Sequence, residues 1–449
     1  MQLNRNMSLG KDSSPGGLPA DIGAPAQNRV EPRLLYKLVV VGFSTLSRLV
    51  ASVLLFALVA RSAGLEDFGV FTYWYAIGTL GASISDYGFG QQVLKDLAGA
   101  ELPKARSHAL SLLCAKGWIS GGIFGAALVF AFASSSSASE VVAGAVLIAS
   151  GMAGSFFDYL AMVLRSRSAL RAESALAAGA SIGASVMAGL AAYVSSSILI
   201  AAIALFLVRI AFVVVEARLL FGSVLYVEPQ LRVAKNSPRS TLKRSLPFAL
   251  DNLALQLFAN LDVLMVKFLL GPQSSGVYLA GTRLTQASLA GLPVIASIFL
   301  PMLSSQRTSL GDLRTLRKKA ILISCLAGLS ILGGFVALQS VVPSTIFGDA
   351  FAALGDLMPF FGGYLCIRYF AAGPSLLLTA LGRQSARALA TSLGVLAAFM
   401  YIGVAYSMTA VIQPLDLCFM MILGAGVQIA AYIFLGRGLQ TQISTPFKE

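Results

Sequence analysis

Apolar runs of about 20 residues or longer recur from Tyr36 almost to the end of the chain. A helix of that length crosses the ~30 Å hydrocarbon core of a lipid bilayer. Because lipid offers the backbone no hydrogen-bond partners, such runs fold as spanning helices that satisfy their own backbone groups. The composition agrees, since 57% of the residues are hydrophobic and 12% are charged. The sequence therefore predicts an all-α integral membrane protein.

The apolar runs, separated by charge clusters and Gly or Pro breaks, predict twelve membrane-spanning helices. Their ranges are approximately 36–60, 68–94, 109–133, 141–164, 172–194, 197–221, 246–270, 276–303, 320–342, 355–381, 387–408 and 415–436. We expect an N-terminal six-helix lobe, a basic cytoplasmic linker and a C-terminal six-helix lobe, flanked by a disordered cytoplasmic tail and a short cytoplasmic tail. The corresponding ranges are 36–221, 222–245, 246–437, 1–35 and 438–449.

The distribution of Lys and Arg sets the expected orientation. If the N-terminus is cytoplasmic, every basic residue outside the spans except Arg61 falls on the cytoplasmic side. The positive-inside rule then places both termini in the cytoplasm and supports an even number of spans. Topology signals beside anionic lipid also explain the net charge of +13 without nucleic acid as a partner.

The sequence carries no pattern typical of an enzyme or a metal site. It contains one histidine, His108, and no HExxH, Walker A or GxSxG motif. The cysteines fall inside apolar runs rather than at disulfide or zinc spacing, and they are Cys114, Cys325, Cys366 and Cys418. We expect no catalytic residues, no metal and no cofactor.

Two short matches indicate an internal repeat. The segment after the first span, "AGLEDFGVF", matches "LGPQSSGVY" after the seventh, with Gly64 aligned to Gly271 at an offset of 207. A second match joins "RSALR" after the fourth span to "RQSAR" after the tenth, at an offset of 216. Two parallel copies of a six-helix unit predict two lobes around a central cavity, with a substrate site at the repeat interface.

Polar side chains inside the seventh predicted span fall on two faces. Asn252, Gln256, Asn260 and Lys267 form one stripe at helical spacing, whereas Asp251 and Asp262 lie on another side. The stripe either lines the central cavity or holds neighbouring helices together by hydrogen bonds. For Asp262 the packing alternative is an ion pair with a neighbouring cation.

Arg48 in the first span is the leading candidate for a phosphate contact. It shares a face with Ser44 and Ser52, and its guanidinium can hold a phosphate through paired hydrogen bonds. The alternative is a structural pair with Asp86 or Asp158. The full set of candidate substrate-binding residues is Arg48, Lys116, Asn252, Gln256, Asn260, Lys267, Arg283 and Arg368.

The other ionisable residues in the spans leave alternatives open as well. Lys116 either faces the cavity or extends to the cytoplasmic interface, and Arg209 is expected to form an intrahelical near-pair with Glu216. Four acids are candidates for binding a coupling proton or sodium ion, or for structural pairing: Asp86, Asp158, Asp251 and Asp262.

The stretch "LVARSAGLEDFGVFTYWYAIGTLGASISDYGFG" resembles the first-repeat signature of the polysaccharide transporter family, the Wzx-type flippases of the multidrug/oligosaccharidyl-lipid/polysaccharide exporter superfamily. The matched positions are Gly64, Phe68, Gly69, Phe71, Asp86 and Gly88. The second repeat is similar, with Leu246 and Pro247 opening its first helix, Asp262 at the recurrent aspartate position, and "GPQSSGVY" following. The resemblance covers about residues 36–437.

The resemblance implies a transporter of the bacterial inner membrane that flips a polyprenyl-diphosphate-linked oligosaccharide by alternating access, for surface polysaccharides such as O-antigen or exopolysaccharide. It makes a polysaccharide polymerase and the export machinery candidate partners. Two alternatives come from the same superfamily: a cation-coupled multidrug exporter and a lipid II flippase, whose branch typically has two more helices. A glycan polymerase or glycosyltransferase would carry a large external loop, and the external loops here are short.

Overall fold

The structure is a computed structural model of the whole chain, and it describes most of the predicted spans. The described residues are 32–97, 101–135, 137–167, 169–226, 256, 260–304, 310–381, 383–409 and 411–443. The described residues leave out most of the expected N-terminal tail (1–31) and the end of the C-terminal tail (444–449). They also leave out 227–255, which contains most of the linker, and 257–259.

The N-terminal lobe is built from long helices that follow one another along the chain. Its elements are α1 (Pro32–Asp86), α2 (Phe89–Leu97), α3 (Leu102–Ser134), α4 (Ala138–Ser166), α5 (Leu170–Ser195), α6 (Ile198–Leu219) and the short π-helix η1 (Leu220–Val224). α1 packs against α4 and α5, and α6 packs against α4 and α5 as well.

The C-terminal lobe has a similar plan with shorter pieces. Its elements are α8 (Leu261–Leu269), α9 (Pro272–Leu289), α10 (Gly291–Ser304), α11 (Leu310–Ala337), η2 (Pro343–Phe347), η3 (Asp349–Phe351), α12 (Leu354–Ala380), α13 (Gln384–Thr409) and α14 (Pro414–Ile443). α12 contacts α11 and α14, and α13 packs on α14.

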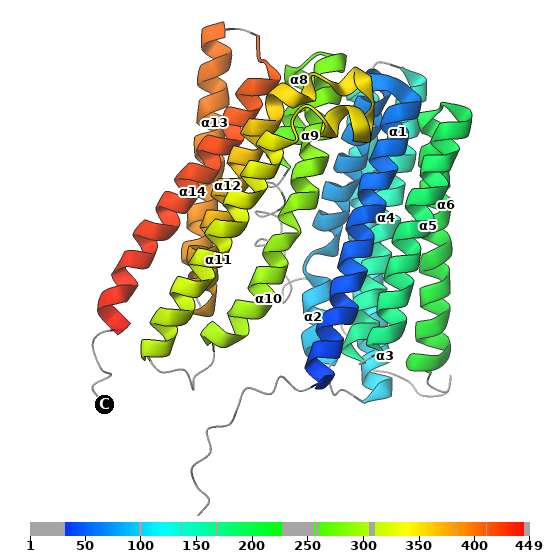
Figure 1. Ribbon diagram of the computed structural model, residues 1–449. Helices are drawn as coiled ribbons and strands as arrows, with labels where there is room; N and C mark the ends of the chain where they lie inside the picture. The colour runs from blue at the N-terminus through cyan, green and yellow to red at the C-terminus, as the bar shows by residue number, and fades with distance from the viewer. Residues whose placement is uncertain are drawn as a thin grey trace, which may run out of the picture.

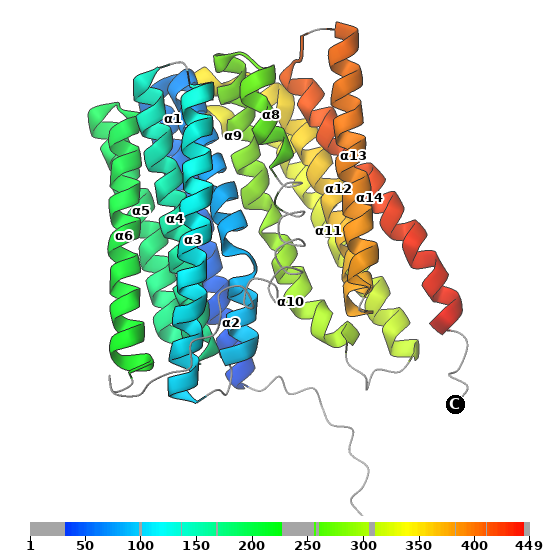
Figure 2. The same cartoon turned by 180° about the vertical axis from the view of Figure 1, so that it is seen from behind.

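Figures 1 and 2 show the two lobes side by side, with α1 to α6 in one bundle and α8 to α14 in the other. The main contact between the bundles is α1 with α9, and α1 also contacts α8, η2 and η3. The largest hydrophobic core contains residues of both lobes, such as Phe68 of α1 and Phe351 of η3, whose ring centroids are 5.2 Å apart. The lobes therefore share part of one apolar core.

A kink divides α1 into two spanning segments. Gly64 has φ 78° and ψ −179°, a left-handed backbone conformation that costs glycine little. The chain therefore turns at Gly64 between two helical segments of α1, which correspond to the first predicted span and most of the second, whose end lies in α2. Within the described residues, nine helices are long and apolar enough to cross a membrane, and the first of them carries this kink.

The twelve-span prediction is supported in part. α12 coincides with the predicted range 355–381 but is not among the nine, and it contains Pro359 and Pro374. Most of the predicted seventh span, 246–270, lies outside the described residues, and its described end is α8 with Asn260 as the N-cap residue. The chain is a multi-span all-α membrane protein, and the number twelve stays a prediction.

The two repeated loops contact each other. A Cβ atom built on Gly69 would lie 3.2 Å from the backbone nitrogen of Gly276 and 3.5 Å from the carbonyl oxygen of Pro272. A Cβ atom on Gly276 would lie 2.2 Å from the carbonyl oxygen of Leu65. Gly69 and Gly276 are separated by 207 residues, as are Leu65 and Pro272, so the contacts are reciprocal between the two copies. This close crossing leaves no room for a side chain at Gly276 and little at Gly69.

Candidate functional site

A cavity of about 700 Å³ lies within the N-terminal lobe, and Gln256 of the seventh predicted span also lines it. Its volume is in the range of small-molecule binding sites. The lining includes six charged side chains from four helices: Arg48, Asp86, Asp158, Arg165, Glu173 and Arg209. Three of these cations and acids, Arg48, Asp86 and Asp158, were named from the sequence.

Arg48 of α1 pairs with Asp158 of α4. Its Nη1 atom lies 3.4 Å from the Asp158 Oδ1 atom, so Arg48 meets one of the two acids proposed as its structural partner. The Asp158 side chain is 60% exposed although it lies deep in the lobe, because it faces the cavity. The pair is therefore open to solvent, and its contribution to stability is small.

Asp86 ends α1 in a turn whose geometry explains the Asp-x-Gly motif. Tyr87 and Gly88 both have positive φ angles, 48° and 75°, which break the helix before α2 begins. The break leaves Asp86 3.3 Å from the Nζ atom of Lys116, which also donates to the Ser155 hydroxyl at 2.7 Å. The Lys116 side chain is 0% exposed. Extension of Lys116 to the membrane interface is therefore wrong, because the ion pair holds it inside the lobe.

Arg209 of α6 lines the cavity, and its hydrogen bonds go to neutral groups. Its Nη1 atom donates to the carbonyl oxygen of Ser150 at 3.0 Å and to the Ser150 hydroxyl at 3.2 Å, and Nη2 donates to the Tyr75 hydroxyl at 3.1 Å. The expected near-pair with Glu216 is wrong. Glu216 is fully buried away from the cavity lining, and among the described residues its two carboxyl oxygens have no hydrogen-bond partner.

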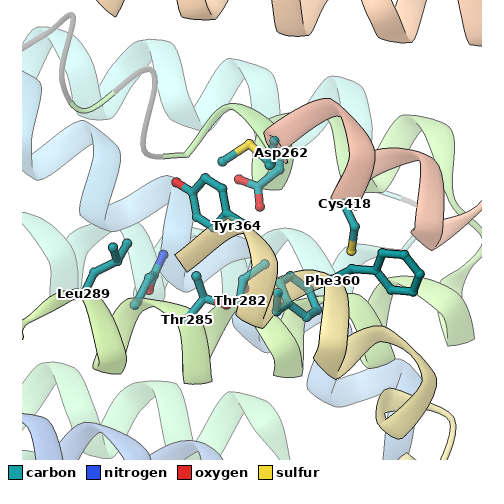
Figure 3. A pocket seen from close by; sticks show the side chains of 10 residues that line it. Asp262, Thr282, Thr285, Leu289, Phe360, Tyr364 and Cys418 are labelled. Atoms are coloured by element: carbon teal, nitrogen blue, oxygen red, sulfur yellow. The ribbon is translucent and has the colours of Figure 1, made fainter. Parts of the chain in front are cut away.

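A second, much smaller cavity of about 20 Å³ lies in the C-terminal lobe beside Asp262. Figure 3 shows its lining, in which the hydroxyl groups of Thr282, Thr285 and Tyr364 stand among apolar side chains. Asp262 Oδ2 accepts a hydrogen bond from Tyr278 at 2.9 Å. The expected ion pair of Asp262 is wrong, because its described hydrogen-bond partner is this neutral hydroxyl.

The other carboxylate oxygen of Asp262, Oδ1, differs from Oδ2. Its Oδ1 atom is buried and has no partner of hydrogen-bond geometry among the described residues, although the backbone N–H groups of Asp262 and Val263 lie near the carboxyl group. A volume of about 20 Å³ is enough for one water molecule or one small cation.

Lys267 lies at the contact between the lobes rather than at the large cavity. It forms an ion pair with Glu140 at the start of α4, and the Trp74 indole N–H donates to the same Glu140 Oε1 atom at 3.1 Å. The ammonium group also lies over the rings of Tyr73 and Trp74, 5.5 and 4.8 Å from their centroids. Lys267 thus ties α8 to the N-terminal lobe.

Two arginines also join the lobes. Arg283 of α9 donates to the carbonyl oxygen of Thr72 at 2.8 Å, and its guanidinium lies 4.3 Å from the Phe56 ring centroid. Arg61, the single basic residue assigned to the external loops, donates to the carbonyl oxygens of Thr345 and Ile346 in η2. Together with Lys267–Glu140 and Gly69–Gly276, these interactions form what we call the cross-lobe contact.

The predicted polar stripe of the seventh span does not face one cavity in the part of the chain that is described. Gln256 lines the large cavity, whereas Asn260 is buried and donates to the Gln256 carbonyl oxygen at 2.9 Å. Arg368 lies in the C-terminal lobe, where it donates to Gln428 at 2.7 Å. The remaining predicted residues, Asn252 and Asp251, lie outside the described residues.

Sequence reasoning missed several lining residues. Arg165 at the end of α4 donates to Glu173 of α5 at 2.8 Å, and both line the cavity. Arg165 had been assigned to the cytoplasmic loop after the fourth predicted span, and Glu173, at the start of the fifth, had not been singled out, so their contribution to a cavity was not expected. Tyr75 gave no polar signal, because a tyrosine in an apolar helix is usually a packing residue. Only the folded lobe shows that it orients Arg209.

The model of the polysaccharide biosynthesis protein family matches residues 35–306, more than half of the chain. The chain belongs to this family. None of the curated proteins matches the chain significantly.

Solved structures with the same fold are transporters. The lipid II flippase MurJ in an inward closed conformation has a TM-score of 0.70 at 12% identity, covering 90% of this chain and 87% of that one. A superfamily transporter from Pyrococcus furiosus, described as having a binding pocket of reverse polarity, has a TM-score of 0.63 at 16% identity, with 91% and 96% covered. A multidrug transporter of the MATE type in complex with MaL6 has a TM-score of 0.61 at 17% identity, with 91% and 97% covered.

At these identities the structural likeness establishes the fold. The chain has the fold of MurJ and the MATE transporters, and its family membership assigns it to polysaccharide biosynthesis. The chain is accordingly a polysaccharide biosynthesis protein with the fold of these transporters.

Proposed function

We propose that the protein flips a polyprenyl-diphosphate-linked oligosaccharide from the cytoplasmic to the periplasmic leaflet of the bacterial inner membrane. The cavity of about 700 Å³, lined by three arginines in a member of the polysaccharide biosynthesis family, carries this proposal. A charged sugar head group cannot cross hydrocarbon unaided, because the loss of hydration is far too costly. The cavity offers that head group a polar path while the polyprenyl chain stays in lipid.

Alternating access between the lobes is the mechanism that the arrangement supports. Under the predicted topology, the loops that carry Gly69 and Gly276 lie outside, so the cross-lobe contact closes the external end of the protein. Arg165 and Glu173 lie near the loop assigned to the cytoplasm and line the cavity. Substrate therefore enters from the cytoplasm, and opening to the outside requires the cross-lobe contact to separate.

Asp262 is our candidate for the residue that binds a coupling proton or sodium ion. Its partnerless Oδ1 atom and the nearby hydroxyl groups of Thr282, Thr285 and Tyr364 provide oxygen ligands beside a space for one small ion. Asp86 and Asp158 are already engaged by Lys116 and Arg48, which favours a structural and binding role for them.

A deletion strain tests the function. Cells without the protein should keep undecaprenyl-linked glycan on the cytoplasmic leaflet and lose one surface polysaccharide, while synthesis of the linked glycan continues. The leaflet is measured by accessibility of the glycan to an externally added lectin in spheroplasts, with a strain carrying the gene on a plasmid as control. Normal surface polysaccharide together with new sensitivity to cationic drugs would replace the flippase by the multidrug exporter.

A further inference from the structure

The cations in and around the large cavity differ in how they are neutralised. Arg48 pairs with Asp158 at 3.4 Å, Arg165 with Glu173 at 2.8 Å and Lys116 with Asp86 at 3.3 Å. Within the described part of the chain, each of these cations therefore has a carboxylate partner of its own.

Arg209 differs from them, because its hydrogen bonds go to a backbone carbonyl and two hydroxyl groups. Asp158 also interacts electrostatically with Arg209, but it is shared with Arg48 and Lys116. Among the four cations in and beside the cavity, Arg209 is therefore the one with no carboxylate of the described residues hydrogen-bonded to it.

The position of Arg209 makes that charge costly. It lies near the middle of α6, where an ionised side chain in a bilayer-spanning helix is costly to bury. A cation kept at such a place is a candidate for binding a substrate group.

The guanidinium is held in a defined orientation and has donors to spare. Of its five N–H groups, the three hydrogen bonds to Ser150 and Tyr75 use Nη1 and Nη2 and leave Nε. The Tyr75 ring supports it, with the guanidinium carbon 5.5 Å from the ring centroid. A Cβ atom on Gly154 would lie 3.9 Å from Nε, so that position carries no side chain to cover the group. The edge with Nε and Nη2 can hold two phosphate oxygens.

We propose that Arg209 is the residue that anchors the phosphate groups of the substrate in the cavity, with Ser150 and Tyr75 orienting its guanidinium. This inference rests on the proposed function and assigns the anionic part of the substrate to one side chain. Arg48 then has a secondary role, because it must leave Asp158 before it can bind a phosphate with its Nη1 atom. The ligand chemistry is a diphosphate, either lipid-linked or free.

Binding measurements on the purified full-length protein in nanodiscs test the assignment. The probes are undecaprenyl diphosphate, inorganic diphosphate and, as a control without phosphate, undecaprenol. Arg209→Gln should weaken diphosphate binding by roughly tenfold or more, because hydrogen bonds to charged groups contribute about 1.5–3 kcal/mol. Arg209→Lys should restore part of the affinity, since an ammonium lacks the two-pronged geometry. Arg48→Gln should weaken binding less than Arg209→Gln.

The comparison of undecaprenyl diphosphate with inorganic diphosphate shows whether the site recognises lipid-linked or free diphosphate. Loss of binding of both probes in Arg209→Gln supports an anchor for the diphosphate itself, and loss of the lipid form alone supports an anchor that requires the polyprenyl chain. Tyr75→Phe, which removes only the hydroxyl group that orients Nη2, should weaken binding of the same probe by a few-fold. This second variant keeps the test valid if Arg209→Gln does not fold.

Two outcomes would overturn the inference, and they differ in whether the proposed function fails with it. If Arg209→Gln and Tyr75→Phe keep wild-type affinity, Arg209 is structural, and the proposed flippase function stands. If the wild-type protein binds neither diphosphate probe but does bind a cationic drug, the inference and the proposed function both fail.

Discussion

The two lobes share a fold but differ in their interiors. The N-terminal lobe encloses a cavity of about 700 Å³ with six charged side chains in its lining, whereas the cavity beside Asp262 in the C-terminal lobe has about 20 Å³ and Asp262 as its one charged lining residue. At the offset of 207, Asp262 aligns with Leu55, which lines the large cavity. The repeat therefore preserved the backbone contact at Gly69 and Gly276 while the polar residues diverged. The difference shows that the symmetry concerns the scaffold and does not extend to the side chains that line these two cavities.

The largest effect is expected at the buried ion pair of the N-terminal lobe. Asp86→Ala leaves the fully buried Lys116 ammonium without its carboxylate, which should destabilise the protein by about 3–5 kcal/mol. Asp158→Ala is the matched control from the same cavity, because its exposed pair with Arg48 should contribute only ~0–1 kcal/mol. Thermal unfolding in detergent and the amount of folded protein measure both. Equal losses in the two variants would contradict the contrast between a buried and a solvated pair.

The crossing of the two repeats gives the next effect. Gly276→Ala places a Cβ atom 2.2 Å from the Leu65 carbonyl oxygen, so the backbones of the two lobes must separate, at a cost of about 1–3 kcal/mol. Gly271→Ala is the control, since nothing lies within 4 Å of a Cβ atom there. The two variants are compared by thermal unfolding in detergent. Unchanged stability of Gly276→Ala would contradict the close backbone contact between Gly276 and Leu65.

The smallest effect on stability is expected at Asp262. Asp262→Asn keeps an oxygen acceptor for the Tyr278 hydroxyl and should cost less than about 1 kcal/mol, whereas Asp262→Ala leaves that hydroxyl unpaired and should cost ~1–3 kcal/mol. If Asp262 binds the coupling ion, Asp262→Asn should nevertheless abolish ion-dependent transport in proteoliposomes. Wild-type transport by Asp262→Asn at unchanged protein abundance would assign Asp262 to packing alone.

Much of the helical arrangement followed from the sequence. The repeat match aligned Gly64 with Gly271, and both occupy a turn between helices in the two lobes. The turns are made differently, because Gly64 uses a positive φ angle at the kink between the two segments of α1, whereas Gly271 has φ −67° and precedes Pro272 at the start of α9. The loop match could not distinguish these geometries, since glycine permits both.

The candidate site was predictable only in part. Arg48, Asp86 and Asp158 were expected to interact or to face the cavity, and all three line it. Lys267 was expected to share a cavity face with Gln256, but it instead pairs with Glu140. Helical periodicity gives the direction of a side chain around its own helix, but it does not state which neighbouring helix lies on that side.

The sequence by itself determined the class of the protein. Its apolar runs can satisfy their backbone groups in lipid only as helices, its basic residues predict the orientation of those helices, and its loop motifs indicate the family. Only the tertiary structure decided which charges meet. Arg209 and Glu216 lie on the same helix but do not pair, because the Arg209 guanidinium is hydrogen-bonded to Ser150 of α4 and Tyr75 of α1. Ion pairs inside a membrane protein depend on contacts of a few ångströms between helices far apart in the chain, and these distances exist only after the helices have packed.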